Sequence, residues 1–348
     1  MGTFTGLCGG LLAVIGVAGA CSPAHADDFY KDKQIKLIIG TGSGGSYDFS
    51  GRMVGRHIHR HIPGNPSIVM QNMPGAGSIN AANFVYGIAP QDGTVLGAIV
   101  QIIPLNHVFD DPGVRFDSGK FQWIGNPSSS VNVYAVWHTA PLKSLDDMFQ
   151  APLIFGGTSR TGSGGADIAL ANNVLGTKFQ LVTGYKGGAE IDLAIERGEV
   201  HGRAGQSWDG WKLTKPDWIK EGKLKVLMQM GLARDKDLKD VPLMTELAKT
   251  DEQKMILGLF SDSVALGRPL VFGPGVPADR VKMLRDAFRK TMSDPEFLAE
   301  AKKANYAVSP IYGEELQKIV ARMLATPAPV IKKAHEAMSF RGEERSAR

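Results

Sequence analysis

Three glycine-rich turns contain the residue types of an anion-binding site. They span residues 43–46, 74–78 and 161–165, and each runs into a predicted helix. Glycine lets the backbone approach an anion closely, and a helix N-terminus presents N–H groups with a partial charge of about +0.5. The serines that can cap these helices or donate a hydroxyl are Ser46, Ser78 and Ser163. Each turn alone is equally typical of a tight strand-to-helix connection, but three at strand ends favour an anion site.

A dinucleotide-binding fingerprint is also present in the first turn. Residues 40–45 satisfy G-x-G-x-x-G after a predicted strand. The next strand, however, ends in Gln71 and Asn72 where a nucleotide-binding protein needs an acidic residue for the ribose. No Lys-Ser or Lys-Thr follows the glycines, so a phosphate-binding P-loop is excluded as well. We expect no nucleotide cofactor.

The sequence contains no complete motif of a serine hydrolase or of a zinc site. The segments 44–48 and 205–209 approach G-x-S-x-G, but both end in Asp where the second glycine is needed. His57 and His61 have the i, i+4 spacing of zinc ligands without the intervening Glu, and they fall beside Met53 on a helical wheel. We therefore predict partly buried packing histidines, no catalytic residue and no metal site.

The elements that position these turns alternate between strands and helices. The chain of 348 residues is long enough for two domains. The pattern predicts strands at 34–39, 67–71, 94–103, 132–137, 153–156, 180–183, 199–204 and 224–230, and helices at 47–62, 79–88, 166–175, 189–197, 278–292, 295–303 and 314–333. Such alternation indicates an α/β fold with two lobes, each a mainly parallel sheet flanked by helices. Ligands bind beyond the carboxyl ends of such strands.

The N-terminal residues and the composition bear on the compartment and the partners. Residues 7–20 are apolar and uncharged, and the small residues of 24–26 predict a secretory signal, residues 1–26, cleaved before Asp27. Both cysteines, Cys8 and Cys21, lie inside this segment, so the mature chain has no thiol. A lipid anchor on Cys21 is an alternative. The net charge of +4 is scattered, which excludes a nucleic-acid arm.

Beyond the turns, short motifs recur in a specific order along the chain. They are residues 30–39, Gly44-Gly45 with Asp48, and residues 72–77, 89–94, 184–188, Arg234, 241–242 with Glu246, and 273–277. In order and spacing they resemble the substrate-binding proteins of tripartite tricarboxylate transporters, the Bug family of periplasmic solute receptors. The resemblance covers nearly the whole mature chain.

The resemblance implies a two-lobed periplasmic binding protein of the Venus-flytrap type. Lobe I would comprise residues 27–125 and 265–348, and lobe II residues 126–264. It further implies that backbone amides from both lobes hold a carboxylate of the ligand. The residues carried over are Ser43, Gly44, Gly45, Ser46 and Asp48 in the first loop, Gly75, Ala76, Gly77 and Ser78 in the second, and Thr158, Ser159, Arg160, Thr161, Gly162 and Ser163 in lobe II. We expect Asp48 to cap the first helix and orient its loop.

Departures from the family pattern indicate where specificity lies. Arg160 replaces a usual glycine, His201 stands where Gly-x-Val-Asp is usual, and Gln71 and Met73 replace Glu and Arg around Asn72. Arg160, or Arg203 two residues after His201, could clamp a second carboxylate, and a surface or lobe-lobe salt bridge is the alternative for either. Residues that follow strands and could complete the cleft wall are Gln101, Gln206, Ser207 and Trp208.

The sequence thus predicts a monomeric periplasmic receptor without cofactor. It would capture a small carboxylate and deliver it to the membrane subunits of a tripartite tricarboxylate-type transporter. An exported α/β enzyme using the same cleft is the alternative, and a sensor subunit would share the same pocket. Which carboxylate binds stays open.

Overall fold

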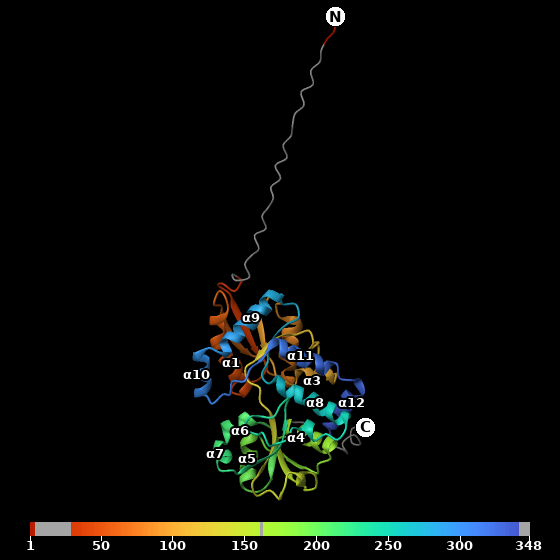
Figure 1. Ribbon diagram of the computed structural model, residues 1–348. Coiled ribbons are helices and arrows are strands. Elements are labelled where there is room, and N and C mark those ends of the chain that lie inside the picture. Colours follow the sequence, from red (N-terminus) through yellow and green to blue (C-terminus); the bar gives the residue numbers. More distant parts are fainter. Residues whose placement is uncertain (4–28, 161–162, 341–348) are drawn as a thin grey trace.

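The computed structural model describes residues 1–3, 29–160 and 163–340. The predicted signal sequence, apart from its first three residues, lies outside the described residues, as do Thr161 and Gly162. Figure 1 shows two lobes, one built from the red-to-orange and blue parts of the chain and the other from the green part. Among the described residues, no helix has the length and apolar character needed to cross a membrane.

The sheet of lobe I has the strand order β11-β4-β10-β3-β1-β2. Its strands are β1 Gln34–Ile39, β2 Ser67–Asn72, β3 Val95–Ala98, β4 Gln122–Asn126, β10 Leu270–Phe272 and β11 Ile311–Tyr312. Strand residues alternate between the two faces, so Leu37 packs under the helices of one face while Ile38 packs with the opposite core. Both faces are therefore buried.

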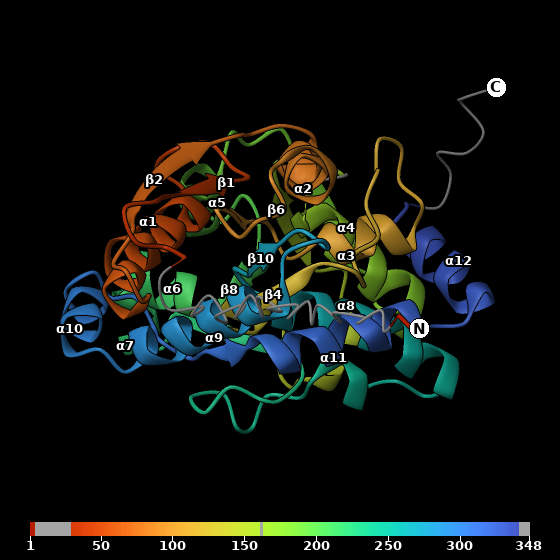
Figure 2. The same cartoon turned by 90° about the horizontal axis from the view of Figure 1, so that it is seen from above.

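Helices cover each face of this sheet. On the side of Leu37, apolar residues come from α1 Ser46–Ile58, α9 Ala278–Met292 and α10 Pro295–Lys303. On the side of Ile38 they come from α2 Ile79–Asn83 and α11 Gly313–Leu324. The view from above shows α1 beside α9 and α10 (Figure 2).

The sheet of lobe II has the order β7-β6-β8-β5-β9. Its strands are β5 Asn132–Trp137, β6 Ile154–Gly157, β7 Gln180–Thr183, β8 Gly202–Ser207 and β9 Leu224–Met230. The flanking helices are α4 Ser163–Leu170, α5 Gly188–Glu196, α6 Trp208–Thr214 and α7 Pro216–Lys220. Along β5, Val133 packs with Trp208 and Trp211, whereas Tyr134 belongs to the larger core on the other face.

Two crossings connect the lobes. The chain leaves lobe I after β4 and enters β5 through 127–131, where Ser129 donates a hydrogen bond to the carbonyl of Ser309 (2.9 Å). It returns through α8 Asp251–Leu266 to β10. Helix α8 packs against α11 and α12 Ala328–Ala337, and Arg322 on α11 pairs with Asp262 on α8. The second crossing is therefore held to the C-terminal helices.

The two-lobed α/β arrangement is confirmed, and both sheets are mixed. In lobe I, β1 runs parallel to β2 and β3, whereas β10 pairs antiparallel with β3 and β4. In lobe II, β6 runs parallel to β7 and β8, whereas β5 runs antiparallel to β8 and β9. The strand that each crossing enters, β5 in lobe II and β10 in lobe I, is reversed relative to its neighbours.

Local boundaries differ from the sequence-based expectation where proline stands. The strand expected at 94–103 ends at Ala98, and α3 Ile103–Val108 follows with Pro104 in its first turn, where a missing N–H costs nothing. The helix expected at 314–333 is split into α11 and α12 at Pro327, which cannot continue a helix. Strand β4 and helix α8 were not expected at all.

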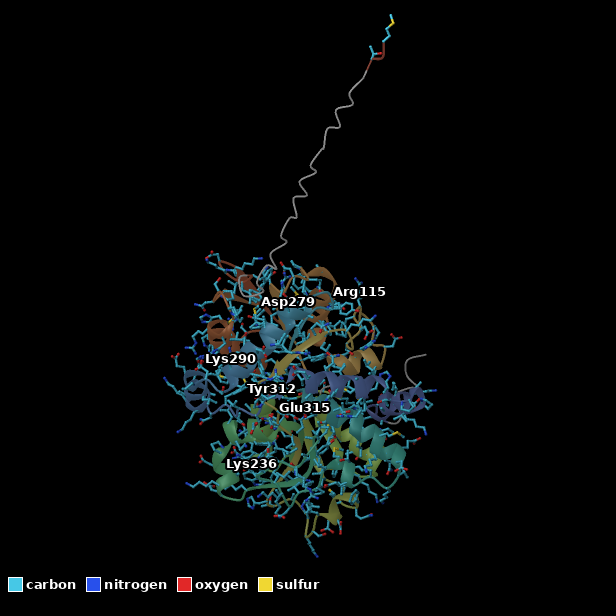
Figure 3. The ribbon with its side chains drawn as sticks, turned by 45° about the horizontal axis from the view of Figure 1, so that its top comes forward. Arg115, Lys236, Asp279, Lys290, Tyr312 and Glu315 are labelled. Carbon is cyan, nitrogen blue, oxygen red and sulfur yellow. The ribbon has the colours of Figure 1, made fainter. Side chains whose placement is uncertain are left out.

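Charged side chains are distributed over both lobes (Figure 3). Asp279 and Lys290 are exposed on α9, and Lys236 is exposed on lobe II after β9. The two signs alternate over short distances, as the scattered net charge implied.

Candidate functional site

A cleft of about 390 Å³ lies between the lobes. Lobe I contributes residues 44–46, Phe49, Arg268 and 304–307 to its walls. Lobe II contributes residues 206–207 at the end of β8 and the first two turns of α6, and Ser128 of the first crossing completes the wall. This is the strand-end position at which open α/β sheets bind ligands.

The first glycine-rich turn presents a helix N-terminus to this cleft. Helix α1 begins at Ser46 after the N-cap residue Gly45, and no side chain caps it. The first helical hydrogen bond runs from the Phe49 amide to the Gly45 carbonyl (2.9 Å). Residues 42–46 are exposed. Uncapped amides and the helix dipole thus point a partial positive charge into the cleft.

Asp48 holds this turn in place. Its carboxylate accepts hydrogen bonds from the Gly44 amide (2.9 Å), from Arg52 Nε (2.8 Å) and from Asn72 Nδ2 (2.7 Å). Burial raises the pKa of Asp48, but these three donors outweigh it, so the pKa lies below its ordinary value. Asp48 therefore orients the loop from behind. The sequence had led us to expect Asp48 to cap the helix as well. It does not, because Gly45 occupies the N-cap position.

Arg268, just before β10, is the basic residue of the cleft. Its guanidinium carbon lies 5.8 Å from the ring centre of Tyr47 and 5.7 Å from that of Tyr306. The Nε atom is buried and has no hydrogen-bond partner, and within the part of the chain that the structure describes no carboxylate pairs with this arginine. A half-buried cation without an acidic partner is a binding position for an anionic ligand group.

The remaining walls combine an apolar surface with polar side chains, which are Ser128, Gln206, Ser207, Asp209, Thr214 and Asn305. Phe49 and Tyr306 form a tilted ring pair with centroids 5.7 Å apart, and Leu213 on α6 is 53% exposed on the lobe II side. The Tyr306 hydroxyl lies 2.8 Å from Ser50 Oγ. Burial raises the pKa of Tyr306 and the Arg268 guanidinium lowers it. Burial has the larger effect, so the pKa of Tyr306 lies above its ordinary value. The phenol therefore stays protonated and available as a hydrogen-bond donor.

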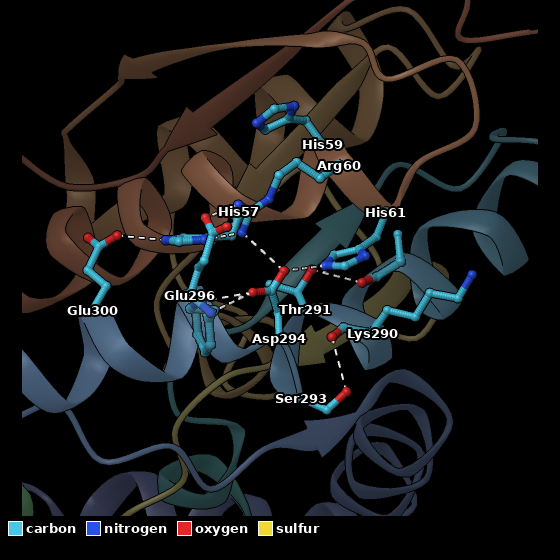
Figure 4. A network of polar contacts seen from close by, with 12 residues as sticks. His57, His59, Arg60, His61, Lys290, Thr291, Ser293, Asp294, Glu296 and Glu300 are labelled. Carbon is cyan, nitrogen blue, oxygen red and sulfur yellow. Dashed lines mark hydrogen bonds and ion pairs between the residues drawn. The ribbon is translucent and has the colours of Figure 1, made fainter.

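A polar network fixes the element that carries Tyr306. Helix α10 ends three residues before it, and Figure 4 shows how this helix is tied to the C-terminal end of α1. His57 Nε2 lies 2.6 Å from a Glu300 oxygen, and His61 Nε2 lies 2.7 Å from an Asp294 oxygen. Arg60 pairs with Asp294 at 3.0 Å. The two histidines contact carboxylate oxygens as well as packing against neighbouring side chains, and no metal cluster is found among the described residues.

The second glycine-rich turn lies at the same sheet edge but does not line this cleft. Its residues Gly75, Ala76, Gly77 and Ser78 all have positive φ (132°, 45°, 61° and 78°). Ser78 is 2% exposed, its Oγ has no partner, and it lies so close to Gly40 that a β-carbon there would come within 1.8 Å of this oxygen. The two turns of lobe I therefore meet, in a strained conformation of the kind found at functional sites.

The lobe II loop is described only in part. Thr158, Ser159 and Arg160 are exposed, and Ser163 begins α4. The Arg160 guanidinium lies 5.3 Å from the ring centre of Phe340, near the C-terminus. The described residues of this loop, 158–160 and Ser163, are absent from the walls of the cleft of about 390 Å³. Its role as a carboxylate clamp stays a prediction.

Five further candidates differ in their placement. Arg203 is 6% exposed, lies 3.3 Å from Asp192 and stacks on Trp211 at 4.5 Å, so it forms a buried salt bridge within lobe II rather than the surface or lobe-lobe pair given as the alternative. Trp208 is 5% exposed and packs in the lobe II core rather than forming the cleft wall. The Gln101 amide contacts the Tyr47 hydroxyl at 3.4 Å, behind the cleft. Gln206 and Ser207 do line it, and Ser207 caps α6 through the Gly210 amide (3.1 Å).

Asp167 is a titratable group that the sequence did not single out. It lies on α4, and its Oδ2 is buried without a hydrogen-bond partner. A β-carbon on Gly205 would come within 3.0 Å of that oxygen. Burial raises the pKa of Asp167 to about 7.

Sequence reasoning missed the residues on the returning parts of the chain. Arg268, Tyr306 and Leu213 all lie far in sequence from the glycine-rich turns. The one available signal was that Arg268 lies at the start of the part of the chain, from residue 265, that we expected to return to lobe I. That signal places it in the cleft only when the antiparallel direction of β10 is known.

Comparisons with known proteins agree with this architecture. A family model described as tripartite tricarboxylate transporter family receptor matches residues 54–335. A curated relative, the UPF0065 protein in the gbd 5' region of Cupriavidus necator, is 25% identical over 333 residues, which cover 92% of this chain and 93% of the relative.

Solved structures show the same fold. A TctC solute-binding protein from Polaromonas superposes with a TM-score of 0.67 at 20% identity, over 87% of this chain and 99% of that one. MatC from Rhodopseudomonas palustris, solved with bound malate, gives 0.58 at 17% identity over 86% and 99%. An R. palustris protein solved with adipate gives 0.58 at 19% identity over 87% and 97%.

Proposed function

Because this chain belongs to the tripartite tricarboxylate transporter receptor family, as the resemblance of its sequence predicted, we propose that it captures a small carboxylate between its lobes. It then presents the ligand to the membrane subunits of a transporter of this type. The family and the structural neighbours are periplasmic solute-binding proteins rather than enzymes. The alternative of an exported enzyme finds no support among these relatives.

The observation that carries the proposal is the combination of Arg268 with the uncapped start of α1 in one interlobe cleft. A carboxylate there receives charge-assisted hydrogen bonds from the guanidinium and from backbone amides. Two or three such bonds contribute roughly 1.5–3 kcal/mol each, and micromolar affinity requires about −8 kcal/mol in total. Lobe closure over the ligand supplies the remainder through burial.

The other glycine-rich turns complete the proposed site. The strained turn at 75–78 adjoins the first turn through Ser78 and Gly40. We place the lobe II loop, 158–163, on the opposite side of the ligand when the lobes close. An Arg160 clamp on a second anionic group would require that Arg160→Ala weaken a dicarboxylate more than a monocarboxylate. Calorimetry that shows equal losses for both ligands would reject this role.

Export to the periplasm completes the proposal. The family is periplasmic, and the segment 1–26 has the apolar and small residues of a secretory signal. N-terminal sequencing of the protein from a periplasmic fraction tests this, with Asp27 as the expected first residue.

Isothermal titration calorimetry with a panel of small carboxylates tests the function. We expect binding without turnover, and Arg268→Gln should weaken it at least about tenfold because one charge-assisted contact is lost. Arg289→Gln is the matched control, since Arg289 also lies over a tyrosine ring, Tyr312, but pairs with Glu314 outside the cleft. Equal effects of the two substitutions, or consumption of the compound, would contradict the proposal.

A further inference from the structure

We infer that this cleft selects a monocarboxylate with an apolar body over compact di- and tricarboxylates. The inference rests on the proposed function and concerns the chemistry of the whole ligand rather than of its carboxylate alone. It follows from three features of the cleft walls: the number of available cations, the charge of the lobe II side, and the apolar surface that faces Arg268.

The first feature is a single positive side chain. Among the described residues that line the cleft, Arg268 is the one lysine, arginine or histidine. The uncapped N-terminus of α1 lies in the same lobe and so serves the same ligand carboxylate. A second carboxylate at the other end of a ligand would lose its hydration without gaining an ionic partner in this cleft.

The second feature is the charge of the opposite wall. Asp209 on α6 lines the cleft, and its Oδ1 lies 2.8 Å from Lys212 Nζ. Lys212 is also paired with Asp237 at 3.1 Å. The charge of Lys212 is therefore already taken up by two carboxylates, and among the described residues this wall offers no cation to a second ligand carboxylate.

The third feature is the apolar surface between these two walls. The rings of Phe49 and Tyr306 lie on the lobe I side, and Leu213 faces the cleft from α6 with 53% of its surface exposed. Ala304 and Ala307 add small apolar groups. An alkyl or aromatic body that covers these side chains gains about 25 cal/mol per Å² of apolar surface removed from water.

Hexanoate and adipate provide the sharpest test, because they share six carbons and differ only in a terminal methyl or carboxylate. Calorimetry at fixed pH and ionic strength should give hexanoate a dissociation constant about tenfold or more below that of adipate. Malate, a compact dicarboxylate, should also bind more weakly than phenylacetate. Adipate or malate binding as tightly as its counterpart would overturn the inference while leaving the receptor proposal intact.

Leu213→Asn tests the apolar wall directly. It should weaken hexanoate and phenylacetate about tenfold and leave malate within about twofold. Leu193→Asn is the matched control, because Leu193 is a 42% exposed leucine on α5 of the same lobe and lies outside the cleft. Equal losses for all ligands would overturn the role of the wall. Absence of binding by every carboxylate in the wild-type protein would instead refute the proposed function itself.

Discussion

Replacing Asp167 by asparagine should stabilise the protein at neutral and alkaline pH. The side chain lies on α4 with a buried, unpartnered oxygen, and burial raises its pKa to about 7. Asparagine has nearly the same shape but cannot ionise. The substitution therefore removes the cost of holding a carboxylate in this position.

The sign and size of the effect follow from linkage. A carboxyl group whose pKa is higher in the folded than in the unfolded state contributes fully to stability below the unfolded value, here 3.8, and this contribution is lost as pH rises toward about 7. The difference of roughly three pKa units corresponds to about 4 kcal/mol at 1.36 kcal/mol per unit, as an upper bound. The gain from Asp167→Asn should thus be near zero at pH 4 and reach its maximum above pH 7.

Urea unfolding at pH 4, 6 and 8 measures this dependence. Asp240→Asn is the control, because Asp240 is exposed on the loop after β9. The variant at 167 should gain stability between pH 4 and 8 relative to wild type, whereas the control should not. A difference that is independent of pH would show that folding does not shift the pKa of Asp167, and a loss of stability that grows with pH would show that the carboxylate is ionised and paired in the folded protein.

Three further predictions concern the residues that hold the lobes in shape. Arg203→Met alone should lower the free energy of unfolding by about 3–5 kcal/mol, because it leaves Asp192 buried without its partner, and adding Asp192→Leu should restore most of the loss; an additive double variant in urea unfolding would contradict this pairing. Asp48→Asn should cost about 1–3 kcal/mol at pH 7 and weaken carboxylate binding. Because the pKa of Asp48 is lowered, that stability difference is present above pH 3.8 and should vanish as pH falls further, and a constant difference in acid unfolding curves would argue against it. Asp294→Ala should lower the free energy of unfolding by about 1–2 kcal/mol, since it removes both the cap of α10 and the partner of His61; an unchanged melting temperature would refute that.

The sequence predicted elements well where hydrophobic periodicity was strong and local. The bounds of β1, β5 and α9 agree with the structure because their apolar residues recur with the period of a strand or a helix. The directions of β5 and β10 could not be predicted, because they depend on how the chain passes between lobes. Hydrophobic periodicity indicates which face of a strand is buried, but it does not indicate which other strand pairs with it in the sheet.

The sequence indicated some of the residues that line the cleft. Residues 44–46 and the predicted Gln206 and Ser207 lie in its walls, since a glycine-rich turn before a helix and the end of a strand both have local signatures. The places of Arg203 and Arg268 depend on tertiary partners, and nothing local distinguishes the arginine that pairs with Asp192 from the one without a carboxylate partner. Trp208 is buried because it packs with Trp211 and other apolar residues of lobe II, which are distant in sequence or on a neighbouring turn.

A crystal structure of the protein with a bound carboxylate tests the central claim most directly. We predict that the carboxylate lies within about 3 Å of the Arg268 guanidinium and of backbone amides in the first turn of α1. A ligand whose carboxylate contacts neither group, or which binds outside the interlobe cleft, would contradict the account.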